Sequence, residues 1–390
     1  MPATAKLYET DPYVQTFTAT VLVCTPAGEQ FAVQLDRTAF YPEGGGQPCD
    51  TGALGTALVT DVQEHGGVIT HTVSAALPVG QTVEGRIDWA RRRDHMEQHT
   101  GEHILSGTLH RLFGAENVGF HIGSDAVRMD TNIPISAEGL KAAETAANRI
   151  IWENVPVSIT YPTREELAAL TYRSKKEIEG QVRIVTIPGA DVCACCGTHT
   201  AFTGAVGQIK ILAAENYKGG VRLSIVCGGR ALEAAQAMRA RQAEIGALLS
   251  AKSSETANAV HRVYDEYTAL KFTHFGLCSQ LFEALAAQAT PGADAIRIVP
   301  GLDPDGLHRL AVRLSEATTG LCAALTPNGK GTGYCLARAG GDVRALTKAL
   351  NTALNGRGGG KPGICQGSCA ATPEQVEDFL KENIDHENAL

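Results

Sequence analysis

The chain has 390 residues, of which 44% are hydrophobic and 19% charged, and its formal net charge is −8. Disordered chains combine low hydrophobicity with high net charge, so this composition excludes disorder as the main state and favours two or three folded domains. The acidic balance excludes a uniformly basic coat, so an RNA partner must meet a local patch. The first residues form no apolar signal segment, and no apolar run reaches the ~18 residues of a membrane span, so we expect a soluble, cytoplasmic protein without a membrane partner.

Residues 1–90 are expected to form a small N-terminal β-barrel. Short alternating apolar runs are separated by turns rich in proline and glycine, which is the pattern of antiparallel strands. The runs cover 14–23, 30–35, 68–73 and 81–87.

A glycine-dense loop lies between two of these runs and contains Gly44, Gly45, Gly46 and Gln47. Glycine adopts backbone angles that tight turns require, but three consecutive glycines exceed what one turn needs. We therefore interpret the loop as a place where a ligand approaches the backbone closely, with the Gln47 amide beside it.

Residues 91–228 are expected to form an α+β core. Helically spaced leucines predict a helix over 93–113, which ends at Gly114. A second helix is expected over about 137–153. Further strands are expected over 182–187, 207–212 and 221–226.

The strongest chemical signal consists of two pairs of potential metal ligands. His99 and His103 stand four residues apart on the first predicted helix, so both imidazoles lie on one face. Cys195 and His199 have the same separation in a turn after a predicted strand. Three nitrogen donors and one sulfur donor suit tetrahedral Zn²⁺. The two pairs together therefore predict a zinc site.

Two points of this site are open to alternatives. Cys193 and Cys196 stand beside Cys195, which we choose because of its spacing to His199. The helix segment also fits the metalloprotease pattern H-x-x-E-H, with Glu102 as the base. A zinc peptidase, however, leaves the cysteine-rich turn unexplained.

The remaining residues are expected to form two more structural regions. Residues 229–290 carry apolar residues at the spacing of a coiled-coil seam, interrupted near Lys252, and predict a helical hairpin that acts as a linker or dimer arm. Residues 291–390 are rich in glycine and are expected to form a small α/β domain, followed by an amphipathic acidic helix over 372–388.

Basic residues gather in the last part. Between 320 and 370 there are six basic residues against one acidic residue, within a chain of net charge −8. The segment 355–362 resembles a phosphate-binding nest of backbone N–H groups, although it does not match a Walker A loop. The expected RNA contacts there are Lys330, Arg357, Gly358, Gly359, Gly360 and Lys361, and a second basic cluster includes Arg91 and Arg92.

Several of these motifs, taken together, resemble a known family. The segments GGGQPCDTG at 44–52, HTGEHIL at 99–105, CACCGTH at 193–199 and KGGVRLSIVCG at 218–228 look like the editing domain of alanyl-tRNA synthetase. They are closer still to the free-standing alanyl-tRNA editing proteins, the AlaX family, in their long form. The segment RGGGKP at 357–362 resembles the C-terminal tRNA-binding domain of the same synthetase.

The resemblance implies a zinc-dependent aminoacyl-tRNA deacylase that hydrolyses Ser-tRNA(Ala) and, as a further substrate, Gly-tRNA(Ala). An alanine pocket cannot exclude glycine by size and rejects an added hydroxyl only weakly, so a second hydrolytic site restores accuracy. By the resemblance, a polar residue on the strand after the first helix lies near the substrate, and His121 is the candidate. Gln47 and Glu102 complete the expected catalytic set. The alternative function is a tRNA-binding module with a purely structural zinc.

Overall fold

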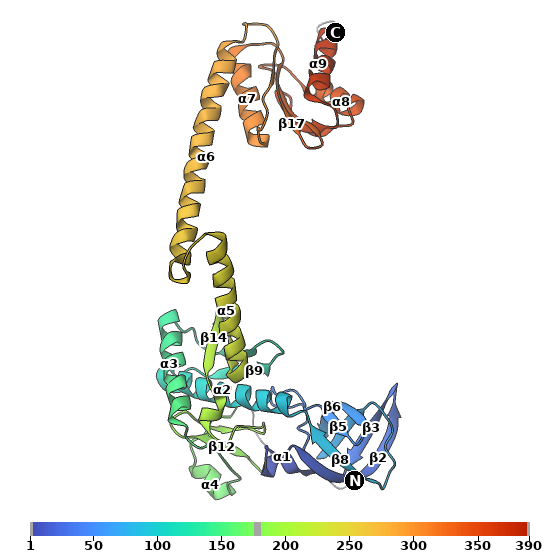
Figure 1. Cartoon of the computed structure of the whole chain (residues 1–390), viewed down its shortest axis with the longest axis vertical. Helices are drawn as coiled ribbons and strands as arrows, with labels where there is room; N and C mark the ends of the chain where they lie inside the picture. Colours follow the sequence, from blue (N-terminus) through green and yellow to red (C-terminus); the bar gives the residue numbers. More distant parts are fainter. Residues whose placement is uncertain (1–2, 175–180, 388–390) are drawn as a thin grey trace. The chain divides into compact units, whose positions relative to one another are not determined.

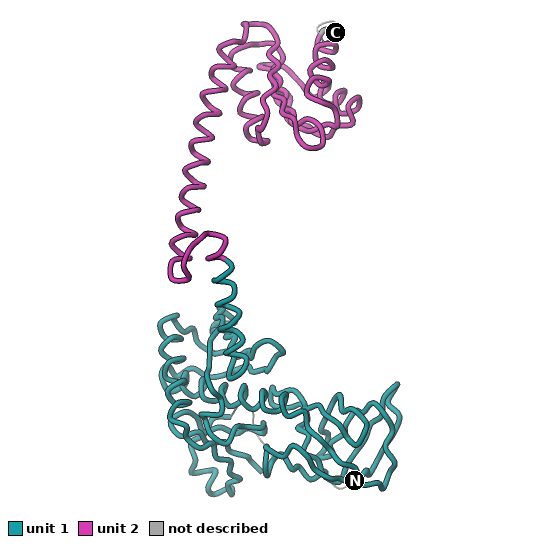
Figure 2. The backbone as a smooth tube through the Cα atoms, viewed as in Figure 1, with its two compact units in different colours: residues 1–244 teal, residues 245–390 magenta. Residues whose placement is uncertain are grey.

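The computed structural model describes residues 3–174 and 181–387, and these form two compact units. Unit 1 covers residues 1–244 and unit 2 covers residues 245–390, with the division inside one helix (Figure 2). The architecture mixes helices with several sheets, which confirms the predicted α+β class. The proposed four-part division into 1–90, 91–228, 229–290 and 291–390 stays a prediction. Among the described residues, no helix combines the length and the apolar character that a membrane crossing needs.

The first part of unit 1 consists almost entirely of strands. Six of them pair in the ring order β2-β3-β7-β6-β5-β8, in which β8 pairs back with β2. Alternate side chains of these strands point inward and form one apolar cluster that includes Val33, Leu54 and Ile69. The elements are β1 (Ala5–Lys6), α1 (Leu7–Thr10), β2 (Thr16–Ala27), β3 (Gln30–Leu35), β4 (Arg37–Thr38), β5 (Gly52–Leu54), β6 (Ala57–His65), β7 (Val68–Val73) and β8 (Thr82–Ile87).

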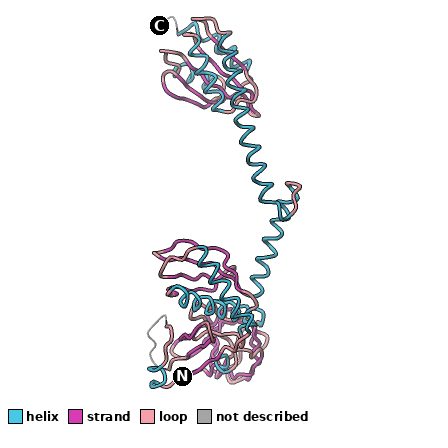
Figure 3. Tube along the Cα trace, turned by 90° about the vertical axis from the view of Figure 1, so that its left-hand side faces the viewer, coloured by secondary structure: helices cyan, strands magenta, loops and turns pink. Residues whose placement is uncertain are grey.

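The second part of unit 1 packs helices on sheets (Figures 1 and 3). A four-stranded sheet has the order β14-β15-β10-β9, and a three-stranded sheet has the order β11-β12-β13. Helices α2 and α3 share one apolar cluster with these strands. The elements are α2 (Trp89–Phe113), β9 (Asn117–Ile122), β10 (Val127–Thr131), α3 (Ala137–Glu153), β11 (Ser158–Thr160), α4 (Arg164–Ala169), β12 (Ile184–Ile187), β13 (Asp191–Ala194), η1 (Thr203–Val206), β14 (Ile209–Tyr217), β15 (Gly220–Cys227) and α5 (Gly228–Leu248).

Unit 2 contains a five-stranded sheet of order β16-β17-β18-β20-β19. Alternate residues of β17 enter different clusters: Leu325 packs with α8 and α9, whereas Ala324 packs with α6 and α7. Both faces of the sheet are therefore covered. The elements are η2 (Ser253–Glu255), α6 (Thr256–Ala287), β16 (Ala295–Ile298), α7 (Pro304–Ala317), β17 (Cys322–Asn328), β18 (Gly331–Ala337), α8 (Arg344–Ala353), β19 (Arg357–Lys361), β20 (Ile364–Cys369) and α9 (Pro373–Glu387). The expected tail helix ran to residue 388, which lies outside the described residues.

Candidate metal centre

The helix α2 places the two histidines. It begins four residues earlier than the predicted position 93, because the Asp88 side chain caps its first turn by accepting a hydrogen bond from the Arg91 N–H. It ends at Gly114, whose φ of 67° is the left-handed conformation that glycine adopts easily. Its middle is buried almost all round, so His99 and His103 lie in the interior of unit 1.

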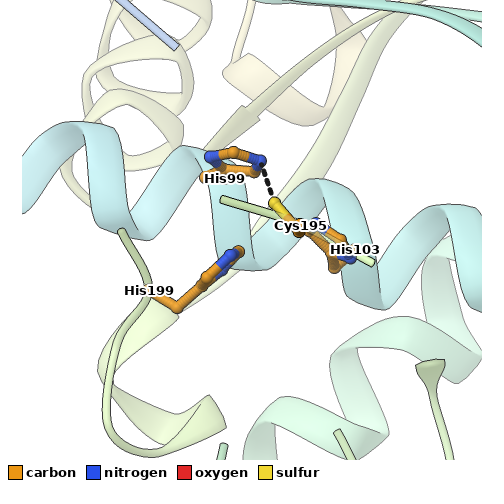
Figure 4. Close-up of side chains that lie close together, drawn as sticks. All are labelled: His99, His103, Cys195 and His199. Carbon is orange, nitrogen blue, oxygen red and sulfur yellow. Dashed lines mark hydrogen bonds between the residues drawn. The ribbon is translucent and has the colours of Figure 1, made fainter. Parts of the chain in front are cut away.

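The structure brings the four predicted donors together. One ligand atom from each of His99, His103, Cys195 and His199 lies within 4.8 Å of the others (Figure 4). Nε2 of His99 is 3.4 Å from Sγ of Cys195. Cys196 is exposed and does not belong to this group. Cys193 instead lies with His103 and Asp191.

Each imidazole is held through its Nδ1 atom, and this leaves Nε2 for the centre of the cluster. Nε2 of His199 is buried without a hydrogen-bond partner. Buried polar atoms rarely lack a partner, so this atom is suited to a ligand. The Nδ1 contacts are His99 to Oε1 of Gln47 at 2.8 Å, His103 to Oδ2 of Asp191 at 2.8 Å and His199 to Oγ1 of Thr100 at 3.3 Å.

Gly197 allows the cysteine turn to approach α2 closely, and Gly101 allows β15 to approach the same helix. A Cβ atom at Gly197 would lie 2.1 Å from Cε1 of His99. Similarly, a Cβ at Gly101 would lie 2.2 Å from Sγ of Cys227. The glycine between the two histidines therefore has a packing role, which its place in a helix did not reveal.

Two of the four clustered donors, Cys195 and His199, have the protonation state that a metal ligand needs. Burial alone would raise the pKa of Cys195, but the neighbouring histidines lower it well below its ordinary value. Burial lowers the pKa of His103, but the Cys195 thiolate and Asp191 raise it well above its ordinary value. At His199, burial dominates and lowers the pKa to about 3. The cluster thus contains a thiolate and a neutral imidazole, which are the forms that ligate metals.

A cavity of about 460 Å³ opens onto the cluster. His99, His103 and Cys195 lie on its wall, together with Gly45 and Gly46 of the glycine loop. Gly46 has a φ of +82°, and a Cβ there would lie 2.5 Å from the Phe120 ring, so only glycine fits. The remaining lining residues are Phe120, Ser174, Cys193, Ala194 and Cys196.

The expected catalytic residues lie in three different environments. Gln47 is fully buried behind His99, so it holds the His99 ring instead of facing the cavity. Glu102 is also buried, accepts a hydrogen bond from Asn117 and is not on the cavity wall, which gives no support to its expected role as a base. His121 is exposed, whereas its neighbour Phe120 lines the cavity, because adjacent residues of a strand face opposite sides.

The basic cluster before α2 requires a correction. Arg92 is fully buried and forms an ion pair with Asp50, so it is not available to an RNA. Its guanidinium also donates to the backbone oxygens of Ala39 and Pro12. Arg91 is partly buried and donates through Nε to the Cys49 oxygen at 3.0 Å. Arg92 therefore joins the strands of 1–90 to α2.

The expected nest at 355–362 is also corrected. Its central residues form the regular edge strand β19 (Arg357–Lys361), which pairs antiparallel with β20 and is exposed along its whole length. Beside it, a cavity of about 370 Å³ separates the strand from α8 and is lined by Arg344, Lys348 and the three glycines. Lys330, Arg357 and Lys361 are exposed as well.

Sequence reasoning missed the residues that support the histidines. Thr100, Asp191 and Arg173 have no local motif, because each acts through a partner far away along the chain. Phe120 was within reach of prediction: it is the neighbour of His121, on the opposite face of the same strand.

Comparison with known sequences shows which family of proteins the chain resembles. Residues 14–91 match the family described as tRNA synthetases class II (A), and residues 182–224 match the threonyl and alanyl tRNA synthetase second additional domain. The chain is 32% identical to the alanine–tRNA ligase of Pyrococcus abyssi, over 98% of the chain and 44% of the ligase. It covers only 30% of the ligase of Natronomonas pharaonis, so it spans less than half of these relatives.

Two shorter relatives match over nearly their whole length. The alanyl-tRNA editing protein Aarsd1 of Danio rerio is 29% identical, over 95% of this chain and 96% of its own length. The protein of the same name from Mus musculus is 28% identical, over 96% of both chains. The chain therefore carries alanyl-tRNA synthetase-family domains and is a homologue, over nearly its whole length, of alanyl-tRNA editing proteins.

Proposed function

We propose that this protein is a zinc-dependent aminoacyl-tRNA deacylase that acts in the cytoplasm on tRNA(Ala) mischarged with serine or glycine. The observation that carries the proposal is that three of the four clustered donors lie on the wall of a cavity of about 460 Å³. A buried donor set next to an open cavity is suited to chemistry on a bound molecule. The full-length similarity to proteins named alanyl-tRNA editing proteins supports this substrate class.

The residues fit a zinc ion. His99, His103 and His199 would offer nitrogen and Cys195 sulfur, a set that Zn²⁺ accepts in tetrahedral sites. The partnerless Nε2 of His199 and the low pKa of Cys195 agree with such a ligand set. A bound zinc ion polarises a carbonyl group or lowers the pKa of a water molecule.

The chain itself would orient the substrate. The absence of a side chain at Gly45, where a Cβ would meet no atom within 4 Å, leaves room for an ester to approach the backbone. Phe120 forms the wall beside His99, with ring centroids 4.9 Å apart. In the reaction, water adds to the ester carbonyl, the bond between the acyl carbon and the ribose oxygen breaks, and that oxygen takes up a proton to become the free ribose hydroxyl.

We place the main tRNA contacts of unit 2 in the groove between α8 and β19. Arg344 and Lys348 supply positive charge on one side, and the glycines of β19 leave the other side open. A Cβ at Gly359 would meet no atom within 4 Å, so packing does not require glycine at this position. An approaching phosphate backbone would require it.

We also propose that the chain forms a homodimer through α5 and α6. Apolar side chains of the predicted seam remain exposed on both helices. They are Leu232, Met238, Ile245, Val260, Val263, Tyr267 and Leu270. The mass in solution, measured by light scattering, tests this: a monomer at all concentrations would contradict it.

The second candidate function is a tRNA-binding module with a structural zinc. It is favoured by the number of donors, because four protein ligands close a tetrahedral site. The deciding experiment is hydrolysis of Ser-tRNA(Ala) by the zinc-loaded and the metal-stripped protein. Hydrolysis that depends on zinc in a chain that stays folded without it supports the deacylase. Zinc-dependent folding without hydrolysis supports the module.

A further inference from the structure

The strand β13 carries a charged residue that the proposed chemistry does not use. Asp191 opens this strand, and Cys195 follows its end, so one short segment reaches the cluster from two sides. The carboxylate is almost completely buried, and its Oδ2 lies 2.8 Å from Nδ1 of His103. A carboxylate oxygen can only accept, so Nδ1 of His103 carries a proton, and Nε2 is the nitrogen that remains to face the cluster.

Arg173 fixes that carboxylate. Its Nε donates to Oδ1 of Asp191 and its Nη2 to Oδ2, both at 2.8 Å. The same Nη2 lies 2.7 Å from Oγ of Ser106 on α2. The planar guanidinium thus contacts both carboxylate oxygens at once, an arrangement that lysine cannot reproduce.

The backbone of Arg173 is tied to the same strand. Its N–H donates to the Val192 oxygen at 2.8 Å, and its oxygen accepts from the Ala194 N–H at 2.9 Å. The next residue, Ser174, lies on the cavity wall. One residue therefore connects the wall of the cavity with the carboxylate behind His103.

The geometry also bears on a second group of potential ligands, formed by His103, Asp191 and Cys193. Both carboxylate oxygens already accept hydrogen bonds, from His103 and Arg173. Asp191 is therefore better suited to orient His103 than to ligate a second ion.

We propose that Asp191 and Arg173 are positioning residues for the metal centre, and that they act through His103 by fixing its tautomer and orientation. This inference rests on the proposed zinc site. Of the three Nδ1 partners, only Asp191 is charged, since His99 is held by an amide and His199 by a hydroxyl. A charged partner raises the basicity of the ligand imidazole, so its loss should matter most.

The test measures Zn²⁺ affinity by chelator competition on the full-length chain. Asp191→Asn removes the negative charge, and the new NH₂ group must face either Arg173, which then loses an acceptor, or Nδ1 of His103, which reverses the tautomer. We expect the dissociation constant to rise by roughly 10- to 100-fold. Arg173→Lys should give a smaller rise in the same direction. The absorption spectrum of bound Co²⁺ should change in Asp191→Asn, because it reports the geometry and strength of the ligands.

Asp130→Asn is the matched control. Asp130 accepts two hydrogen bonds from Arg222, both at 2.7 Å, in the same bidentate arrangement but without contact to a clustered histidine. Its Zn²⁺ affinity should equal that of the wild type. An Asp191→Asn chain that binds Zn²⁺ within twofold of the wild type would overturn the inference and leave the metal site standing.

Two further outcomes are decisive. If the wild-type chain binds no Zn²⁺, both the inference and the zinc-dependent function are wrong. If Asp191→Asn does not fold, as judged by circular dichroism, Arg173→Lys carries the test, and wild-type affinity in that variant would overturn the inference.

Discussion

Oε1 of Gln47 lies 2.8 Å from Nδ1 of His99, so the glycine loop and the metal-site helix meet in one hydrogen bond. The orientation of the amide is set by the cysteine turn: Nε2 of Gln47 donates to Oγ1 of Thr198 at 2.9 Å, and Oε1 also accepts the Thr198 N–H at 3.1 Å. A residue 52 positions away along the chain thereby fixes which nitrogen of His99 is free.

The first prediction concerns this contact. Gln47→Ala removes the acceptor behind His99 and should weaken Zn²⁺ binding by roughly tenfold, the lower end of the range for such supporting residues, because the partner is neutral. Chelator competition measures the effect. Gln63→Ala is the control, since Gln63 also lies among the strands of 1–90 but its side chain donates hydrogen bonds to Asp61 and Glu43. Equal affinities for the two variants would contradict the assignment.

The second prediction concerns Arg92. Because the guanidinium is fully buried and paired with Asp50, Arg92→Ala leaves a buried carboxylate without its partner. Breaking such a pair should lower the free energy of unfolding by about 3–5 kcal/mol. Urea denaturation measures this. Arg93→Ala, whose side chain is 66% exposed, should change stability by less than about 1 kcal/mol. If Arg92→Ala changes the free energy of unfolding little but greatly weakens tRNA binding, Arg92 contacts the RNA, as the sequence predicted.

The third prediction concerns pH. Burial lowers the pKa of His71 to about 4, whereas the unfolded chain has the ordinary value of 6.5. Between these values the unfolded state binds the proton and the folded state does not. The free energy of unfolding is therefore not reduced by His71 above pH 6.5, and it decreases as the pH falls toward 4. The loss should reach roughly 3 kcal/mol.

Thermal unfolding between pH 4 and 7 tests this. His71→Gln should flatten the pH dependence relative to wild type, whereas His65→Gln should leave it unchanged, because His65 is exposed. Identical pH profiles for wild type and His71→Gln would refute the role of His71.

The fourth prediction concerns the groove in unit 2. Lys348→Ala should weaken binding of tRNA(Ala) and reduce the slope of log affinity against log salt by about 1, because one phosphate contact is lost. Gly359→Ala should weaken binding without loss of stability, since its Cβ would enter open space. Lys381→Ala, on α9, is the control for charge alone. If the slope of log affinity against log salt is unchanged in Lys348→Ala, the RNA does not bind in the groove between α8 and β19.

The four clustered donors could be predicted from sequence because the geometry within each pair is local. Four residues make about one helical turn, so spacing alone placed His99 beside His103. The two pairs meet in the structure because β13 leads the cysteine turn to α2.

The other features of the site and the fold could not be predicted, because they depend on residues that are distant in the sequence. Arg92 looked like a basic surface residue because nothing near it in the chain reveals Asp50, 42 positions away. His121 is exposed whereas Phe120 lines the cavity, and the sequence did not reveal which face of this short strand turns toward the cavity, because a shift by one residue exchanges the two faces. The glycines of β19 have low strand propensity, and pairing with β20 overrides it.

The most direct test of the account is the hydrolysis of Ser-tRNA(Ala) by the zinc-loaded chain and by His103→Ala, with Ala-tRNA(Ala) as the correctly charged control. We predict that the wild-type chain releases serine and spares Ala-tRNA(Ala), and that His103→Ala falls to the uncatalysed rate while remaining folded. Equal rates of serine release by wild type and His103→Ala would contradict the account.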